Sequence, residues 1–144
     1  MSLTVGRRER EGIIILDLAG ALTVGEGATA LRDMLRDILA TRQASVILNL
    51  AGTDYIDSTG LGAMVVCYTT SRKSGGRLVL LNLNRRHMEL LILTKLSTVF
   101  EIFDDEQDAV NSFFPNRQIR RFDILSFVEQ KEEGGAKDDS KLGG

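Results

Sequence analysis

The sequence predicts a single α/β domain with a mixed, mostly parallel sheet of about five strands, about four helices and an initial β-hairpin. Three observations lead to this prediction. The chain has 144 residues, 43% of them hydrophobic, which suits one compact domain with one core. Two extended segments near the N-terminus flank Gly12. After them, stretches with helical spacing of apolar residues alternate with short aliphatic runs, as happens when helices connect parallel strands.

The first three elements are two strands and a helix. Leu3–Arg10 is a weak extended segment, and Gly12–Gly20 holds a nearly continuous aliphatic run, so we expect two strands joined near Gly12. The clearest helix of the sequence follows, because apolar residues recur at the spacing of one helix face with charged residues opposite. These apolar residues are Val24, Ala28, Leu31, Leu35, Ile38 and Leu39.

A second strand-to-helix unit occupies the middle of the chain. Ser45–Leu50 is a short β-branched run that predicts a buried strand feeding a loop over residues 54–62. The next helix has its apolar face at Leu61, Met64, Val65 and Tyr68. Gly75 and Gly76 end it, since glycine is favoured after a helix, and Arg77–Leu83 predicts a third buried strand.

The rest of the chain divides into a final part of the domain and an extension. Asn84–Thr94 has helical spacing, Val99–Phe103 is a short apolar run, and Asp105 can cap a last helix that ends before Pro115. We therefore expect the domain to span residues 1–115. Residues 116–130 fit both a helix face and strand alternation, which leaves their structure open, and the polar residues 131–144 predict a disordered tail.

Composition argues against several classes of function. The net charge of -2 and the interleaved charges give no basic surface for direct nucleic-acid binding. No apolar run reaches the ~18 residues of a membrane span, and no secretory or transit leader is visible, so we expect a cytoplasmic protein without membrane insertion. The single cysteine, Cys67, predicts a buried packing residue rather than a disulfide or a zinc ligand. No cofactor-binding or metal-binding motif is convincing; the stretch Gly25–Ala30 matches a dinucleotide fingerprint but lacks its strand context.

The segment YIDSTGLGAM, residues 55–64, raises three interpretations of Ser58: a nucleophile, a helix cap or a phosphorylation site. A nucleophilic serine needs a base within hydrogen-bond reach. The only histidine, His87, is expected at the surface near the start of a helix, and the Gly-x-Ser-x-Gly elbow is absent. Asp54 and Asp57 are close enough for a carboxylate pair, but acids in such loops usually cap turns. We therefore expect no enzymatic activity.

Helix capping alone explains much of the segment. Asp57, Ser58 and Thr59 are all good N-cap residues, and Gly60 and Gly62 permit close backbone approach. Local features alone do not decide between a helix that is only capped and one that is capped and also regulated.

The arrangement from about residue 4 to 114 resembles the STAS domain of bacterial anti-sigma factor antagonists. The resemblance is carried by Ile56–Gly62, which follows the strand Val46–Leu50, and by the turns at Leu18–Gly20 and Gly75–Leu78. It implies that Ser58, with Thr59 as second choice, is phosphorylated by a partner that is both an anti-sigma factor and an ATP-dependent serine kinase. The unphosphorylated antagonist binds this partner and frees a sigma factor, and a phosphatase resets the phosphorylated form. The partner-binding surface implied around the serine comprises Asp54, Asp57, Ser58, Thr59, Gly60 and Leu61.

Physical chemistry offers a reason for such a switch. A phosphate adds roughly -1.5 to -2 charges, which a helix N-terminus accommodates but a close interface does not. A loss of ~3 kcal/mol at an interface weakens binding more than a hundredfold. Two alternatives stay open: a STAS adaptor docking on a transporter ATPase or signalling complex without phosphorylation, and an anion-binding domain using the same helix N-terminus. Gly20–Thr23 also departs from the family pattern, because this loop carries no acidic residue.

Overall fold

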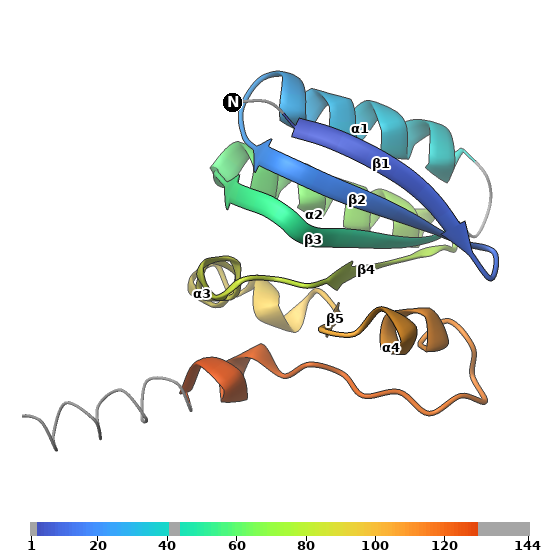
Figure 1. Cartoon of the computed structure of the whole chain (residues 1–144). Helices are drawn as coiled ribbons and strands as arrows, with labels where there is room; N and C mark the ends of the chain where they lie inside the picture. Colours follow the sequence, from blue (N-terminus) through green and yellow to red (C-terminus); the bar gives the residue numbers. More distant parts are fainter. Residues whose placement is uncertain (1–2, 41–43, 130–144) are drawn as a thin grey trace, which may run out of the picture.

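The computed structural model of the chain describes residues 3–40 and 44–129. Its five-stranded sheet has the order β1-β2-β3-β4-β5 (Figure 1). Strands β1 and β2 are antiparallel, and all later neighbours are parallel, so the predicted mixed α/β sheet with an initial hairpin is confirmed. The strands span Leu3–Arg10 (β1), Ile13–Leu22 (β2), Ser45–Ile56 (β3), Arg77–Leu81 (β4) and Ile102–Phe103 (β5).

The hairpin closes through a two-residue turn. Arg10 is paired with Ile13, and the intervening Glu11 and Gly12 have φ values of 54° and 82°. Two consecutive left-handed residues are what a tight hairpin turn needs to match the twist of its strands, and glycine adopts that conformation at little cost. The predicted strand connection near Gly12 is confirmed.

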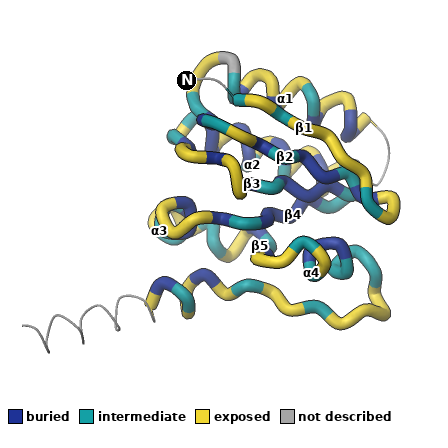
Figure 2. The backbone as a smooth tube through the Cα atoms, viewed as in Figure 1, coloured by how far each residue is buried: buried dark blue, intermediate teal, exposed yellow. Residues whose placement is uncertain are grey.

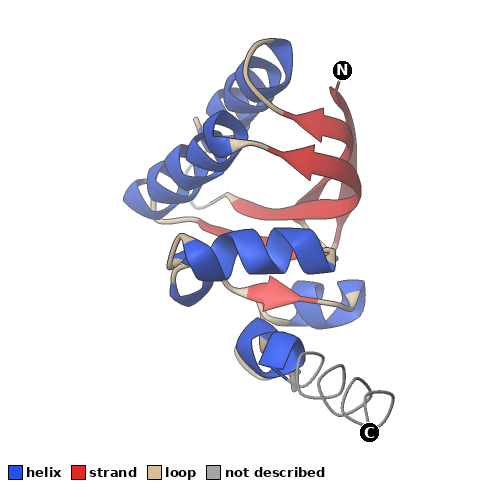
Figure 3. Ribbon diagram, turned by 90° about the vertical axis from the view of Figure 1, so that its left-hand side faces the viewer, coloured by secondary structure: helices blue, strands red, loops and turns tan. Residues whose placement is uncertain are grey.

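Four α-helices and one short 3-10 helix connect or follow the strands within residues 3–40 and 44–111. They are α1 (Glu26–Leu39), α2 (Ser58–Lys73), α3 (Arg85–Leu93), η1 (Leu96–Thr98) and α4 (Glu106–Asn111). Figure 3 shows α1 and α2 side by side on one face of the sheet, with α4 on the opposite face. The domain is therefore a three-layer α/β/α arrangement.

Alternation along the strands produces two cores. Leu16, Val46 and Leu80 belong to the larger core beneath α1, α2 and α3, whereas their neighbours Ile15, Ile47 and Val79 belong to the smaller core with α4. Successive side chains of a strand point to opposite faces, so a strand buried on both faces needs a continuous aliphatic sequence. Figure 2 shows β2, β3 and β4 buried in the middle, while the edge strand β1 is largely exposed.

Several boundaries differ from prediction; β2 runs to Leu22, and β4 ends at Leu81 instead of Leu83. Val24 lies before α1 and is 71% exposed, so it is not part of that helix's apolar face. The reason is Gly25, whose φ of 100° places it outside the helix as the N-cap. Strand β3 continues to Ile56, six residues beyond the predicted end, because its polar C-terminal half keeps backbone pairing with β2 up to Leu22↔Ile56.

The predicted helix ends are confirmed. Asp105 caps α4 by accepting a hydrogen bond from the Asp108 N–H at 3.0 Å. After α2, Gly75 has a φ of 79°, the left-handed conformation that favours glycine at a helix C-terminus.

The extension over residues 116–130 packs on the domain as far as it is described. Residues 124–129 are helical, which selects the helix over the strand alternative. Ile124 and Val128 are buried in the larger core, and the backbone N–H of Phe122 donates to the Ile102 carbonyl at 3.0 Å. The predicted tail, residues 131–144, lies outside the described residues.

Candidate functional site

The candidate site lies where β2 and β3 end and α2 begins. Ligand and partner sites of α/β folds concentrate at this carboxyl edge of a parallel sheet, because the loops there leave the sheet on rigid supports. Here the loop after β2 and the first turn of α2 are neighbours, since Leu22 pairs with Ile56 and the Asp57 N–H donates to the Leu22 carbonyl at 3.2 Å. The arrangement brings residues 22–24 beside residues 55–60.

Asp57 is the residue that organises this loop. One of its carboxylate oxygens accepts a hydrogen bond from the Gly60 N–H at 2.8 Å, which makes Asp57 the N-cap of α2. The other accepts from the Val24 N–H at 3.0 Å. Hydrogen bonds from these two backbone groups hold the pKa of the Asp57 carboxyl below its ordinary value of 3.8, with the Gly60 bond the larger cause. The cap is therefore fully ionised at neutral pH.

Gly60 allows α2 to start against the end of β2. A Cβ atom at this position would lie 2.0 Å from the Leu22 carbonyl oxygen and 2.8 Å from its carbon, closer than any side chain can approach. The other glycine of the segment, Gly62, has nothing within 4 Å of such an atom. Only the first glycine is thus required by packing, and it fixes the position of the helix N-terminus.

Ser58 occupies the first position of α2 and is exposed. Its hydroxyl makes no hydrogen bond with any described residue. Asp57 is the N-cap of α2, although the sequence alone also allowed Ser58 or Thr59 in that role. A helix N-terminus presents free N–H groups and the positive end of the helix dipole. The Ser58 oxygen is therefore an accessible hydroxyl in an environment that stabilises negative charge.

The predicted contact residues divide into two groups. Asp54 and Ser58 are exposed and Asp57 and Thr59 half-buried, so these four can meet a partner. Gly60 and Leu61 are buried, with Leu61 part of the larger core. They support the surface from beneath rather than forming it.

Two exposed residues of this region were not predicted as part of the site. Val24 and Tyr55, which is 42% exposed, are among the exposed large hydrophobic residues. The Val24 N–H donates a hydrogen bond to Asp57, and Tyr55 pairs with Ala21 at the end of the sheet. The sequence could have predicted that Tyr55 is exposed, because strand alternation turns it away from the core when its neighbour Ile56 faces inward. Both add apolar area to the polar surface around Ser58.

The expectation that His87 lies at the surface is wrong. Its exposed fraction is 2%, and it packs with Met88 on the inner side of α3. Asn84 caps α3 by accepting from the His87 N–H at 2.8 Å, and its side-chain nitrogen lies 3.4 Å from Nε2 of the ring. Burial, and secondarily the charge of Arg86, lower the pKa of His87 below 6.5, while Asp54 acts in the opposite direction. Asn84 is therefore the contact of Nε2, Nδ1 is buried without a partner among the described residues, and no hydrogen bond joins the ring to Ser58 there.

Other classes of site find little support among residues 3–40 and 44–129. In this part of the chain no cluster of three or more histidine, cysteine or acidic residues could hold a metal ion. None of the described helices combines the length and apolar character of a membrane span. Cys67 is buried, as predicted, and burial raises the pKa of its thiol to about 11.

Comparison with known proteins identifies the family. Residues 5–109 match the STAS domain. The chain is 34% identical over 110 residues to the anti-sigma-B factor antagonist of Bacillus subtilis, covering 76% of this chain and 99% of that protein. It is 25% identical to the anti-sigma F factor antagonist of Paenibacillus polymyxa, covering 76% and 94% of the two chains.

A solved structure shares the fold. The anti-sigma factor antagonist from Mycobacterium paratuberculosis has a TM-score of 0.66 at 19% identity, covering 77% of this chain and 93% of that one. The STAS match and the 34% identical relative confirm the resemblance inferred from Ile56–Gly62. The match to the STAS domain over most of its length shows that this chain belongs to the STAS domain family.

Proposed function

We propose that the chain is an anti-sigma factor antagonist switched by phosphorylation of Ser58. In its unphosphorylated form it binds an anti-sigma factor that is also a serine kinase, and this binding releases a sigma factor. The observation that carries the proposal is the exposed hydroxyl of Ser58 at the first position of α2, which makes no hydrogen bond with any residue that the structure describes and lies beside the cap supplied by Asp57. The names of the two bacterial relatives support the partner class.

The domain can accept the modification without refolding. Transfer of the γ-phosphate of ATP to the Ser58 oxygen leaves the Asp57–Gly60 hydrogen bond in place, because Ser58 is not the cap. The N–H groups of the first helical turn and the dipole of the 16-residue helix offset the new charge. Phosphorylation therefore changes the surface while the interior keeps its packing.

A phosphate on Ser58 is less easily accommodated in the interface with the anti-sigma factor than within the domain itself. An unmodified surface of Val24, Asp54, Tyr55, Asp57, Ser58 and Thr59 combines apolar area with two carboxylates. A dianion at Ser58 adds to the negative charge of Asp54 and Asp57 and has to be desolvated inside a close interface. Losing ~3 kcal/mol in this way lowers affinity more than a hundredfold.

The remaining parts of the proposal follow from this switch. A phosphatase returns the phosphorylated form to the binding state, and the chain acts in the cytoplasm as a binding module rather than as an enzyme. Residues 1–115 form the STAS domain, and the extension from 116 to 130 serves to stabilise it. Burial of Ile124 and Val128 in the larger core supports that role for the extension.

Labelling by the cognate kinase tests the acceptor. Incubation with ATP should label the wild-type chain and Thr59→Ala to one phosphate, as followed by phosphate-affinity electrophoresis, and should leave Ser58→Ala unlabelled. Full labelling of Ser58→Ala would contradict the assignment. A native protein that stays unmodified and co-purifies with a transporter subunit would favour the adaptor alternative instead.

A further inference from the structure

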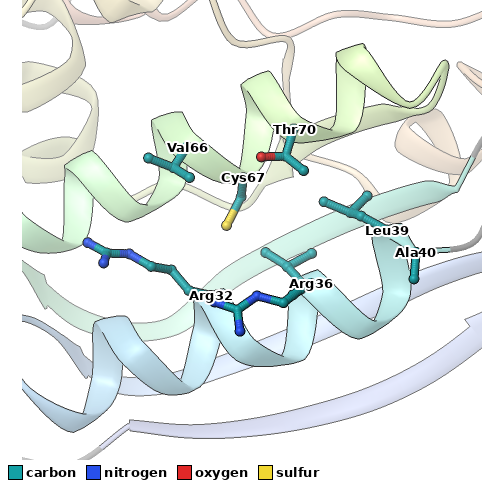
Figure 4. Close-up of a pocket in the computed structure, with 8 residues that line it drawn as sticks. Arg32, Arg36, Leu39, Ala40, Val66, Cys67 and Thr70 are labelled. Carbon is teal, nitrogen blue, oxygen red and sulfur yellow. The ribbon is translucent and has the colours of Figure 1, made fainter.

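A groove runs between α1 and α2 on the outer side of these helices (Figure 4). It holds a cavity of about 320 Å³. Figure 4 shows its walls, with side chains from α1 below and from α2 above. The residues that line it are Arg32, Leu35, Arg36, Leu39, Ala40, Val66, Cys67 and Thr70.

The floor of the groove is apolar. Leu35, Leu39 and Cys67 are buried beneath it, and Val66 is 52% exposed at its wall. In Figure 4 the Cys67 sulfur points into the space between the helices. Burial keeps this thiol neutral at physiological pH, since its pKa is raised to about 11. The floor thus offers a hydrocarbon contact surface without charge.

The rim of the groove is cationic. Arg32 and Arg36 are four residues apart, which places them on the same side of α1, and both extend along the groove in Figure 4. Asp33 and Asp37 are each one position further along the helix, and neither lines the groove. The set of described lining residues includes no aspartate or glutamate.

These two arginines have weaker ion pairing than Arg8 and Arg10 among the described residues. Arg8 and Arg10 each hold Glu106 at 2.7 Å. In contrast, Arg36 approaches Asp33 only at 3.7 Å, between two largely exposed side chains, and Arg32 has no ion pair within the described part of the chain. Their guanidinium donors are available to an anion above the apolar floor.

We propose that this groove binds an amphipathic anion with one unbranched hydrocarbon chain, a fatty carboxylate, whose head group pairs with Arg32 and Arg36. The groove has a volume of about 320 Å³. Since a water molecule occupies roughly 30 Å³, this volume is on the order of ten waters, and a ligand with about ten heavy atoms fits it. An apolar lining with a few polar groups is the usual composition of a small-molecule site. A carboxylate suits the rim because guanidinium groups bind it through paired hydrogen bonds.

This site is separate from the proposed switch. Val66 comes eight residues after Ser58 along α2, which is about 12 Å at 1.5 Å per residue. None of the residues of the Ser58 surface lines the groove. The proposal does not depend on which protein binds there, and its failure leaves the phosphorylation switch untouched.

Titration calorimetry with decanoate, below its micelle concentration, tests the site. The full chain should bind one decanoate, and decanol and decyltrimethylammonium should bind at least tenfold more weakly, because they lack the anionic head group. Arg32→Gln/Arg36→Gln should weaken decanoate binding at least tenfold, since it removes both charge-assisted contacts. The control Arg86→Gln/Arg120→Gln removes the same charge from exposed arginines elsewhere and should bind like the wild type.

Amide chemical-shift mapping provides the second measurement. Decanoate should perturb residues 32–39 of α1 and 66–70 of α2 in the wild type, with the amides of residues 55–60 little changed. The proposal is overturned if decanoate fails to bind, if decanol binds equally well, or if the two double variants lose affinity equally. Shifts centred elsewhere, with the α1 and α2 residues unperturbed, would also overturn it.

Discussion

A carboxylate oxygen of Asp57 accepts a hydrogen bond from the Val24 backbone N–H at 3.0 Å, so the cap of α2 also holds the loop that precedes α1. Its second oxygen bonds the Gly60 N–H at 2.8 Å. One side chain thereby fixes both the helix on which Ser58 stands and the neighbouring exposed residue Val24. The surface around Ser58 is held in place before any partner arrives.

Asp57→Ala should lower the thermal midpoint by about 2–6 °C at pH 7, because it removes a helix cap together with the bond to the loop. Asp57→Asn should lower the thermal midpoint by less, since its amide oxygen can still accept one hydrogen bond. Because the pKa of Asp57 is depressed in the folded state, its contribution is present above the ordinary value of 3.8. The contribution is lost as pH falls through the folded pKa.

Thermal unfolding of both variants at pH 7 and pH 2 checks this expectation. The difference between the wild type and Asp57→Asn should shrink at the lower pH. Asp54→Asn is the control, because Asp54 is exposed and accepts no hydrogen bond from the described residues. Equal midpoints for Asp57→Ala and wild type at pH 7 would show that the cap contributes nothing.

Gly60→Ala and Gly62→Ala should change stability in opposite directions. A methyl group at residue 60 would meet the Leu22 carbonyl at 2.0 Å, so the start of α2 or the end of β2 has to move. We expect a loss of at least ~2 kcal/mol in the free energy of unfolding. At residue 62 the space is open, and replacing a helical glycine by alanine should add up to ~1 kcal/mol. Urea unfolding of the two variants measures both, and a stability loss of the same size in each would contradict the packing argument.

Stability should depend on pH through His87, the only histidine of the chain. Burial lowers the pKa of its ring in the folded state below the ordinary 6.5, so the unfolded chain binds a proton first as pH falls. The free energy of unfolding should therefore decrease as pH falls from 7 through 6.5 and level off below the folded pKa. Carboxylates with depressed pKa values, such as Asp17 and Glu106, act only near and below their ordinary values of 3.8 and 4.5.

A nuclear magnetic resonance titration of the His87 ring, with urea unfolding at pH 5 and 7.5, tests this dependence. The ring should titrate below 6.5, and His87→Gln should remove the change in unfolding free energy between the two pH values. Titration at or above 6.5 would mean that the ring is not held neutral by burial.

Val24→Asp should weaken binding of the anti-sigma factor without destabilising the domain. Val24 is 71% exposed and lies beside Asp57, so a charge there replaces apolar contact area of the proposed interface. We expect affinity to fall about tenfold or more with an unchanged thermal midpoint. Val66→Asp, at an exposed valine on the outer side of α2, is the matched control and should bind normally. If the two variants bind equally well, Val24 lies outside the interface.

The elements that sequence predicts well are those with strong local signals. The aliphatic runs of β2, β3 and β4, the amphipathic spacing of α1 and the cap Asp105 are all encoded within a few residues. The run Asp57–Thr59 marked the start of α2 without deciding which of its residues caps the helix. The family resemblance depended on the same kind of signal, the segment Ile56–Gly62. Each of these features is settled by neighbours in the chain, so distant contacts do not alter it.

Features that depend on distant parts of the chain were not predictable. His87 is buried because α3 packs on the sheet, which no pattern around Arg86 and Met88 reveals. The end of β3 depends on its pairing with β2, and the ambiguous segment after residue 116 becomes helical where Ile124 and Val128 meet the larger core. The exposure of Val24 likewise follows from the left-handed Gly25 that delays α1.

The affinity of the cognate anti-sigma factor for this chain, with and without a phosphate on Ser58, tests the central claim most directly. Both forms should give the same circular dichroism spectrum, because the domain accommodates the phosphate. The unphosphorylated form should bind at least a hundredfold more tightly in titration calorimetry. Equal affinities of two folded forms would contradict the account.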